Sequence, residues 1–425
     1  MGAVASSANA NWQWQTAATL EEEAMRAKAT IGNAISLPPL NAQVRHMWAA
    51  ARGFLCPLLV LTFGLLLVNC GGDNGPAPPC TNCNPSSSDF VYQANANQVS
   101  IVEVDSNSGM VQAMPNPVAG AQIPGGIVAT SNNFLYVTEA EGSGGVVYAY
   151  EVNTSTGDLT PVMGSPFNTG VAQPAQGMAV DPAGKFLYIT EPNTNQVAGF
   201  VIGANGALTA IAGSPFDTND TRPTATTVDA SGHYLYVSNQ DSTQGTVSAF
   251  SIDSSTGGLT PIAGSPFATA AGGGPSQLSA DPTGKYLYIP LSGGTAVFAF
   301  SIDSTGALSP IAGSPFAVGS QPNSVTIDPT GKFLYSADFK GNDVSVLSID
   351  AATGTLTPIS GSPVAVANNP FQVSMNSSGT LLFVGLANAL NIATYTIAST
   401  GMLTPVAPLS GGQTSGGVVI IHKTS

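Results

Sequence analysis

The chain has 425 residues, of which 43% are hydrophobic and only 8% are charged, and it contains 48 glycines and 31 prolines. This composition is too apolar for a disordered protein and rich in residues that end short strands, so it favours a turn-dense β protein. The formal net charge of -14 argues against a nucleic-acid partner, because such proteins need many lysines and arginines to neutralise phosphates.

The N-terminal segment has the pattern of an export signal. Arg52 precedes an apolar run from Phe54 to Val68, and Cys70 follows that run directly. A membrane span needs about 20 apolar residues and this run is shorter, so we interpret residues 47–70 as a cleaved signal peptide. The sequence LVNC resembles the bacterial lipoprotein signal, in which the cysteine is lipidated after cleavage. An uncleaved signal anchor is the alternative.

These features predict an exported protein, anchored through a lipid on Cys70 and facing the periplasm or the cell exterior. We expect residues 1–46 to be an N-terminal extension that the mature protein lacks, and residues 71–88 to be a flexible linker. The linker contains Cys80 and Cys83. A zinc site would need a second pair of ligands, so we expect either a local disulfide or two linker thiols there.

A repeat fills residues 89–425. An aromatic residue recurs every 44 to 52 residues, at Tyr92, Tyr136, Tyr188, Tyr236, Tyr288, Tyr335 and Phe383. Each full copy has four short apolar runs separated by motifs such as DPTG and STG, whose Asp, Pro and Gly favour tight hairpins. The repeat predicts an all-β fold, a seven-bladed β-propeller with four-stranded antiparallel blades.

The two ends of the repeat complement each other. The first copy, FVYQANANQVSIVEV, lacks the first strand of the unit, whereas SGGVVIIHK near the C-terminus is one strand left over. We therefore expect the C-terminal strand to join the first blade and close the ring, which removes a free sheet edge.

The recurring motifs point to a known family. The pattern D-P-x-G-K-[FY]-L-Y, followed by V-x-x-F-S-I-D, T-G-x-L-T-P and G-S-P-F, resembles the lactonase-type seven-bladed propellers over residues 89–425. That family includes 6-phosphogluconolactonases and muconate lactonising enzymes, so the resemblance implies a lactone hydrolase. The shared residues form turns and packing contacts, and they do not define a reaction.

Candidate site residues follow from the expected strand order. The loops that enter the first strand and leave the second strand of each blade open on one face, the mouth. The DPxGK turns lie on the opposite, far face, with Lys185, Lys285, Lys332 and His233, and His422 falls there too. The candidate ligand-binding residues at the mouth are Gln176, Gln277, Asn323, Gln372, Asn239 and Asp338, and the candidate catalytic residues are Arg222, Glu191 and Glu139.

Two functions fit this arrangement. In a lactone hydrolase acting on a sugar acid or aromatic acid, Arg222 would polarise the carbonyl while Glu191 or Glu139 activates water. The alternative is a non-catalytic envelope propeller that binds a carbohydrate, peptide or protein, and the lack of a histidine at the mouth favours it. We expect a monomer without cofactor that meets the membrane only through its lipid. We also expect no metal, since Asp217, Asp220 and Asp241 lack a recognised calcium-ligand spacing.

The signal assignment makes a direct prediction about the mature N-terminus. Intact mass spectrometry of the protein from a bacterial envelope should show a chain that begins at Cys70 and carries added acyl mass. A Cys70→Ala variant should lose that mass. A chain that retains residues 1–69 would contradict the assignment.

Overall fold

The computed structural model describes residues 88–95, 97–114, 117–121, 124–139, 145–170, 176–240, 245–269, 273–366, 369–387, 392–406 and 415–422. Every regular element in these ranges is a β-strand. A search of the same residues for a helix able to span a membrane finds none. The leader, Cys70 and the pair Cys80 and Cys83 lie outside the described residues.

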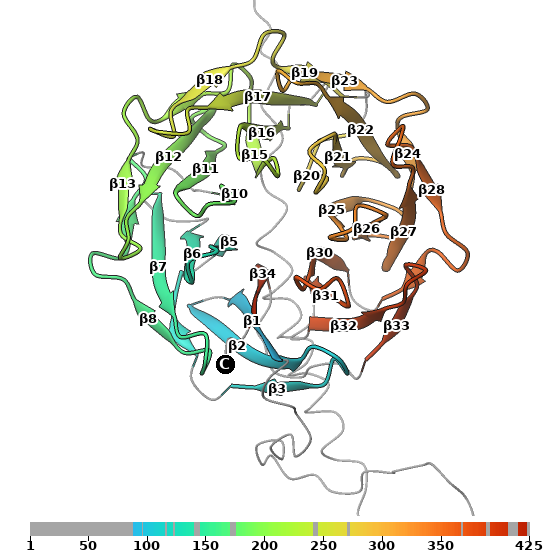
Figure 1. Ribbon diagram of the computed structural model, residues 1–425, viewed down its shortest axis with the longest axis horizontal. Helices are drawn as coiled ribbons and strands as arrows, with labels where there is room; N and C mark the ends of the chain where they lie inside the picture. Colours follow the sequence, from blue (N-terminus) through green and yellow to red (C-terminus); the bar gives the residue numbers. More distant parts are fainter. Residues whose placement is uncertain are drawn as a thin grey trace, which may run out of the picture. The chain divides into compact units, whose positions relative to one another are not determined.

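The strands form seven antiparallel sheets arranged as a ring, so the predicted seven-bladed propeller is confirmed (Figure 1). The first strand of each blade lies nearest the axis. The first strands are β5 (Pro124–Ala129), β10 (Met178–Val180), β15 (Pro223–Val228), β20 (Ser279–Ala280), β25 (Pro322–Ile327), β30 (Pro370–Met375) and β34 (Ser415–His422). The second strands are β1 (Ser88–Asn95), β6 (Phe134–Glu139), β11 (Phe186–Glu191), β16 (Tyr234–Asn239), β21 (Tyr286–Leu291), β26 (Phe333–Asp338) and β31 (Leu381–Leu386).

The outer strands complete each blade. The third strands are β2 (Gln98–Asp105), β7 (Val146–Val152), β12 (Gln196–Ile202), β17 (Thr246–Ile252), β22 (Ala296–Ile302), β27 (Asp343–Ile349) and β32 (Ile392–Ile397). The fourth strands are β3 (Val111–Ala113), β8 (Leu159–Pro161), β13 (Leu208–Ala210), β18 (Leu259–Pro261), β23 (Leu308–Pro310), β28 (Leu356–Pro358) and β33 (Leu403–Pro405). Blade 1 consists of β34, β1, β2 and β3, and blades 2 to 7 follow in chain order.

Six blades carry a fifth, two-residue strand on the third strand, which refines the four-stranded prediction. These short strands are β4 (Val118–Ala119), β9 (Phe167–Asn168), β14 (Phe216–Asp217), β19 (Phe267–Ala268), β24 (Phe316–Ala317) and β29 (Val364–Ala365). The GSPF motif positions most of them. In blade 4 the Ser265 hydroxyl accepts a hydrogen bond from the Ala249 N–H at 2.9 Å. That N–H lies between the segments of β17 paired with β18 and β19, so the serine satisfies a donor that neither strand reaches.

A tyrosine in the second strand joins each of six blades to the next. The Tyr92 hydroxyl of blade 1 donates to the Gly157 carbonyl of blade 2 at 2.9 Å. The equivalent bonds, between 2.8 and 3.1 Å long, are Tyr136–Gly206, Tyr188–Gly257, Tyr236–Gly306, Tyr288–Gly354 and Tyr335–Gly401. Gly257 has φ +76°, and a Cβ there would lie 2.5 Å from the Phe186 ring, so the turn beneath the tyrosine needs glycine.

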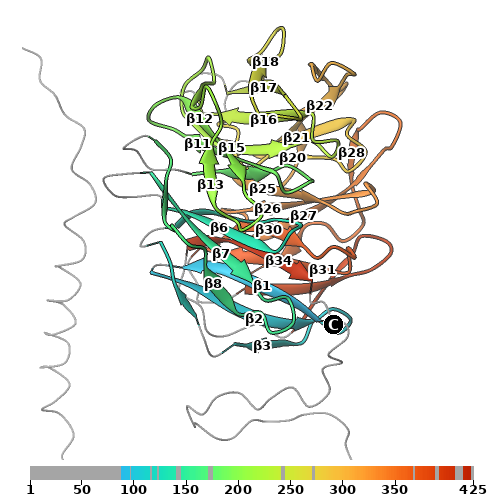
Figure 2. The ribbon, with the colours of Figure 1, turned by 60° about the vertical axis from the view of Figure 1, so that its left-hand side comes forward.

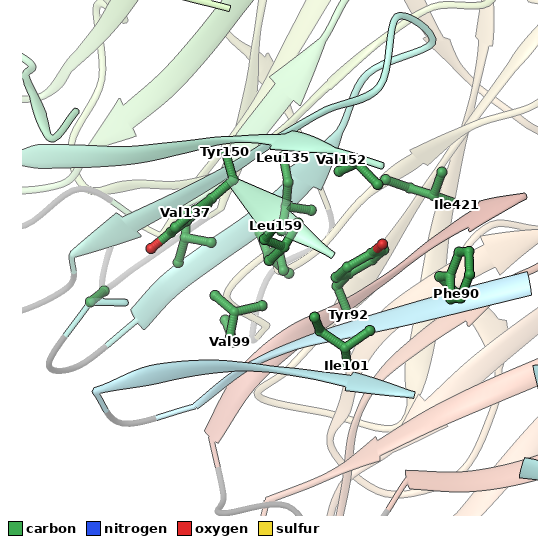
Figure 3. Packing of buried hydrophobic residues seen from close by; sticks show 13 residues of the cluster. Phe90, Tyr92, Val99, Ile101, Leu135, Val137, Tyr150, Val152, Leu159 and Ile421 are labelled. Atoms are coloured by element: carbon green, nitrogen blue, oxygen red, sulfur yellow. The ribbon is translucent and has the colours of Figure 1, made fainter. Parts of the chain in front are cut away.

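Neighbouring blades stack face to face (Figure 2). Clusters of buried apolar side chains from both blades fill the space between them. Figure 3 shows the interface of blades 1 and 2, where Tyr92 and Ile101 face Leu135 and Leu159. Both faces of a middle strand are covered in this way. All eight residues of β1 are buried, which explains why the second strands are apolar without alternation.

The far-face turns of blades 3 to 6 share one construction, in which the turn aspartate accepts bonds from two main-chain N–H groups. In blade 5, one Asp281 carboxylate oxygen accepts bonds from the N–H groups of Lys285 and Tyr286, both at 2.7 Å. The side chains of Lys185, Lys285, Lys332 and His233 are exposed on these turns. The far-face placement expected from the sequence is therefore confirmed for them, and the backbone of His422 lies at the same end, opposite Asp89.

The chain ends close the ring as predicted. β34 pairs antiparallel with β1, with Tyr92 opposite Val419, and Figure 1 shows β34 on the axial side of β1. Blade 7 has Phe383 at the tyrosine position, so it lacks the hydroxyl that joins the other blades. Blade 7 instead contacts blade 1 through other hydrogen bonds. Asn376 Nδ2 donates to Asp89 Oδ2 at 3.2 Å, and the Thr380 hydroxyl donates to the Ser106 carbonyl at 3.2 Å. Asn376 occupies the turn position of Asp281, where a carboxylate would repel Asp89.

Removal of residues 413–425 tests the closure. This deletion takes away β34 and exposes the inner edge of β1, so the thermal unfolding midpoint should fall by about 10 °C or more. Removal of residues 423–425 alone, which leaves β34 intact, is the matched control. A midpoint within a degree or two of the full chain would contradict the closure role.

Candidate functional site

A cavity of about 450 Å³ lies on the propeller axis, between the mouth-side ends of the first strands. This volume is in the range of small-molecule sites, roughly 300–1,000 Å³. Its described lining contains no charged side chain. The polar residues that line it are Gln176, Gln240, Gln277, Asn323, Gln372, Thr224, Thr226, Ser276 and Ser324.

Hydroxyl groups of the second strands hold the cavity wall in place. The Thr138 hydroxyl in blade 2 donates to the Gln176 carbonyl of blade 3 at 3.2 Å, and the Ser238 hydroxyl in blade 4 donates to the Ser276 carbonyl of blade 5 at 2.8 Å. A main-chain bond of 3.1 Å joins the Gln277 N–H to the next first strand. The backbone around the cavity is therefore fixed from blade to blade, which favours a preformed site.

Four of the predicted ligand-binding amides line this cavity, but they are used differently. Asn323 Nδ2 donates to the Phe371 carbonyl at 2.9 Å, and Gln372 Oε1 accepts a bond from the Val418 N–H at 2.8 Å. The partly exposed side chains of Gln176 and Gln277 make no hydrogen bond to any described residue. Gln176 and Gln277 therefore have free amide groups for a ligand, while Asn323 and one end of Gln372 join blades.

The candidate base Glu191 is buried away from the cavity. It shares a face of β11 with Leu187 and Ile189, which pack against blade 2, and its exposed fraction is 0%. The Thr194 hydroxyl lies 3.5 Å from Glu191 Oε2, and Oε1 has no hydrogen-bond partner among the described residues. Burial raises the pKa of Glu191 to about 7, although bonds from Thr169 and Thr194 act in the opposite direction.

Other candidates at the ends of the second strands are buried in the same way. Asp338 accepts bonds from the hydroxyls of Ser345 at 2.6 Å and Ser336 at 2.7 Å. Burial raises the pKa of Asp338, and the nearby Asp343 carboxylate acts in the same direction. Asn239 Nδ2 donates to the Ser248 hydroxyl at 2.8 Å.

None of these second-strand ends is part of the cavity lining. Glu139, at the end of β6, is also buried, and neither it nor Asp338 nor Asn239 lines the described cavity. Their catalytic or ligand-binding role stays a prediction. The hydrogen bonds of Asp338 and Asn239 to Ser345 and Ser248 join the second and third strands of their own blades.

Arg222 stands at the mouth with an exposed side chain, two residues before Thr224 of the cavity lining. Its main-chain N–H donates to Asn195 Oδ1 at 3.0 Å, and its φ of +54° lies in the left-handed region. Gln321 and Asn369, at the same position of blades 6 and 7, have φ of +57° and +52°. The left-handed backbone conformation is therefore a common feature of the loops that enter these first strands. What distinguishes blade 4 is the guanidinium side chain.

Sequence reasoning missed the aromatic part of the mouth. Phe371 lines the cavity, and Phe339 contacts it from blade 6, next to the exposed Lys340. Gln240 also lines the cavity. A comparison of equivalent loop positions across the blades would have found these residues, because they depart from the repeat.

The described residues contain no group of three or more His, Cys, Asp or Glu side chains placed to hold a metal ion. Asp217 and Asp220 instead accept bonds from the main-chain N–H groups of Asn219 at 2.8 Å and Thr221 at 2.7 Å. Asp241 lies outside the described residues.

Seven antiparallel blades around an axial cavity with no charged side chain in its described lining define a propeller with a site of small-molecule size. The family model described as "Lactonase, 7-bladed beta-propeller" matches residues 167–270 and 266–418, more than half of the chain. The chain belongs to this lactonase propeller family, which confirms the resemblance found in its motifs. A search of curated proteins finds no match.

Solved structures share the fold at low sequence identity. A Bacteroides uniformis protein provisionally described as a 6-phosphogluconolactonase has a TM-score of 0.69 and 16% identity, over 79% of this chain and 100% of that one. The periplasmic gluconolactonase PpgL of Pseudomonas aeruginosa has a TM-score of 0.67 and 16% identity, over 80% of this chain and 100% of its own.

The buried Glu191 predicts a pH dependence of stability. Its folded pKa of about 7 exceeds the ordinary glutamate pKa of 4.5, so the folded state binds the proton more tightly and stability falls as pH rises between these two values. Glu191→Gln should match the wild type near pH 4.5 and exceed its free energy of unfolding at pH 8 by about 1–3 kcal/mol, measured by urea titration. The exposed Glu151→Gln is the control, and parallel pH curves for wild type and Glu191→Gln would contradict the assignment.

Proposed function

We propose that this protein hydrolyses an uncharged lactone of a sugar acid in the axial cavity. The observation that supports it is the chemistry of the lining: amides and hydroxyls with no charged side chain among the described residues, in a lactonase-family propeller. Amides both donate and accept hydrogen bonds, as sugar hydroxyls do. A phosphorylated lactone would need lysine or arginine contacts that this lining does not supply.

In this proposal the amides of the cavity bind the hydroxyls of the sugar ring, and Arg222 at the mouth acts on the lactone carbonyl. Gln176 and Gln277 bond the hydroxyls, and Arg222 polarises the lactone carbonyl from the rim. Glu191, with a pKa of about 7, has the proton affinity of a general base at neutral pH. Its side chain is buried and does not line the cavity.

We further propose that the protein works outside the cytoplasmic membrane, held by a lipid on Cys70. The apolar run followed by Cys70 supports this location. Its structural neighbour PpgL is described as periplasmic, which is said of that protein alone.

A binding protein without catalytic activity is the second candidate. The favouring observation is that no described residue lining the cavity is an acid or a base. Binding of an uncharged carbohydrate would need only the hydrogen bonds of the amides and hydroxyls.

A panel of lactones distinguishes the two candidates. The purified protein should open D-glucono-1,5-lactone or another neutral sugar lactone faster than its spontaneous hydrolysis, with a lower kcat/KM for 6-phospho-D-glucono-1,5-lactone. Arg222→Ala should lower kcat/KM about 10- to 100-fold. Gln277→Ala should raise KM about fivefold through one lost hydrogen bond.

Lys285→Ala removes a far-face cation and should behave as wild type. Turnover of the phosphorylated lactone in preference to the neutral one would contradict the substrate class. No turnover on any lactone, with saturable binding of a neutral sugar, would replace the hydrolase by the binding protein.

A further inference from the structure

The repeat serves as an internal control for residues at the mouth. In the first-strand position after the opening proline, blades 2, 4, 5 and 6 have Gly125, Thr224, Ser276 and Asn323, whereas blade 7 has Phe371. The residue after the second strand is Gln240, Ser292 and Ala387 in blades 4, 5 and 7, and Phe339 in blade 6. The propeller therefore forms at these positions without aromatic side chains, and the two phenylalanines require another explanation.

Phe339 and Phe371, the two aromatic exceptions, contact each other across neighbouring blades. The rings of Phe339 and Phe371 form an edge-to-face pair with centroids 6.5 Å apart and planes at 78°. Both side chains are partly exposed, and Phe371 lines the cavity. An edge-to-face partner fixes the plane of the ring that it contacts. Phe339 therefore braces Phe371 from the neighbouring blade.

Asparagine side chains hold the backbone of both aromatic residues. Asn323 Nδ2 donates to the Phe371 carbonyl at 2.9 Å, and Asn369 Nδ2 donates to the Phe339 carbonyl at 2.9 Å. The Ser276 hydroxyl in turn donates to Asn323 Oδ1 at 3.2 Å, which extends the network to blade 5. The pair is thus fixed by its ring contact and by the backbone, as expected of a preformed contact surface.

The cavity consequently has two chemically different parts. Blade 7 contributes an aromatic ring, while blades 3 and 5 contribute the amides of Gln176 and Gln277, which have no partner among the described residues. A pyranose-type ring has matching chemistry, since its axial C–H groups form an apolar face and its hydroxyls lie around the edge. The negative face of a phenyl ring attracts such C–H groups.

We propose that Phe371, braced by Phe339, is the specificity-determining platform on which a six-membered sugar lactone stacks, with its hydroxyls toward Gln176 and Gln277. This inference rests on the proposed function and deepens it, because it specifies a hydroxylated saturated ring rather than an aromatic one. Phe371 positions the ring and takes no part in proton transfer.

A tryptophan reporter tests the contact without any need for turnover. The three tryptophans of the chain, Trp12, Trp14 and Trp48, all precede residue 70, so the propeller itself contains none. The probe is D-glucono-1,5-lactam, an uncharged ring that resists hydrolysis. Its addition should change the emission of Phe371→Trp saturably, whereas the wild type and the far-face variant His233→Trp should not respond.

Calorimetric titration with the same lactam measures the contribution of the ring. Phe371→Ala should bind about 3- to 10-fold more weakly, and Phe371→Tyr should stay within about twofold of wild type, as expected for an aromatic contact. Equal thermal unfolding midpoints of wild type, Phe371→Ala and Phe371→Tyr would show that the loss is not a folding defect. Should Phe371→Ala unfold early, Phe371→Trp and Phe371→Tyr still report on the contact.

The outcomes separate this inference from the proposed function. Lactam binding that depends on Phe371, without hydrolysis of any lactone, supports the platform and contradicts the hydrolase. Hydrolysis with unchanged KM in Phe371→Ala supports the hydrolase and overturns the platform. Saturation of Phe371→Trp by 3,4-dihydrocoumarin and not by the lactam overturns the sugar assignment.

Discussion

The hydrogen bond from a second-strand tyrosine to a turn glycine of the next blade is the constraint on which the ring depends. The Tyr236 hydroxyl reaches the Gly306 carbonyl at 3.1 Å in a fully buried interface, where an unpaired carbonyl would be costly. This bond sets how each blade lies against the next. Burial raises the pKa of Tyr236, so the hydroxyl remains a donor at physiological pH.

Because these bonds and the far-face turns fix the frame, the mouth can vary between blades. Asp281 ties its turn through two main-chain N–H groups, and the same construction recurs around the far face. At the mouth, Arg222, Gln321 and Asn369 share one backbone conformation but carry different side chains. A constant backbone with variable side chains is how one scaffold presents different sites.

The sequence predicts the fold well because the repeat encodes it in local residues. The turn motifs and apolar runs give the strands of each blade. The missing strand of the first copy and the extra strand at the C-terminus indicate how the seven blades close into a ring. The sequence predicts the cavity amides because the opening proline marks the mouth end of each first strand. The carboxylates are harder to place. Whether Glu191 faces the axis or a neighbouring blade depends on side-chain alternation against blade 2, which no local pattern reveals. Phe371 is invisible to a search for polar groups, although it departs from the repeat as clearly as Arg222 does.

A crystal structure of the protein with D-glucono-1,5-lactam tests the central claim, a rigid propeller whose uncharged axial cavity recognises a sugar ring. The account predicts density for the lactam inside the cavity, with the ring over Phe371, its hydroxyls bonded to Gln176 or Gln277, and the first strands unmoved. Density only at the outer rim or the far face, with an empty cavity at saturating lactam, would contradict it.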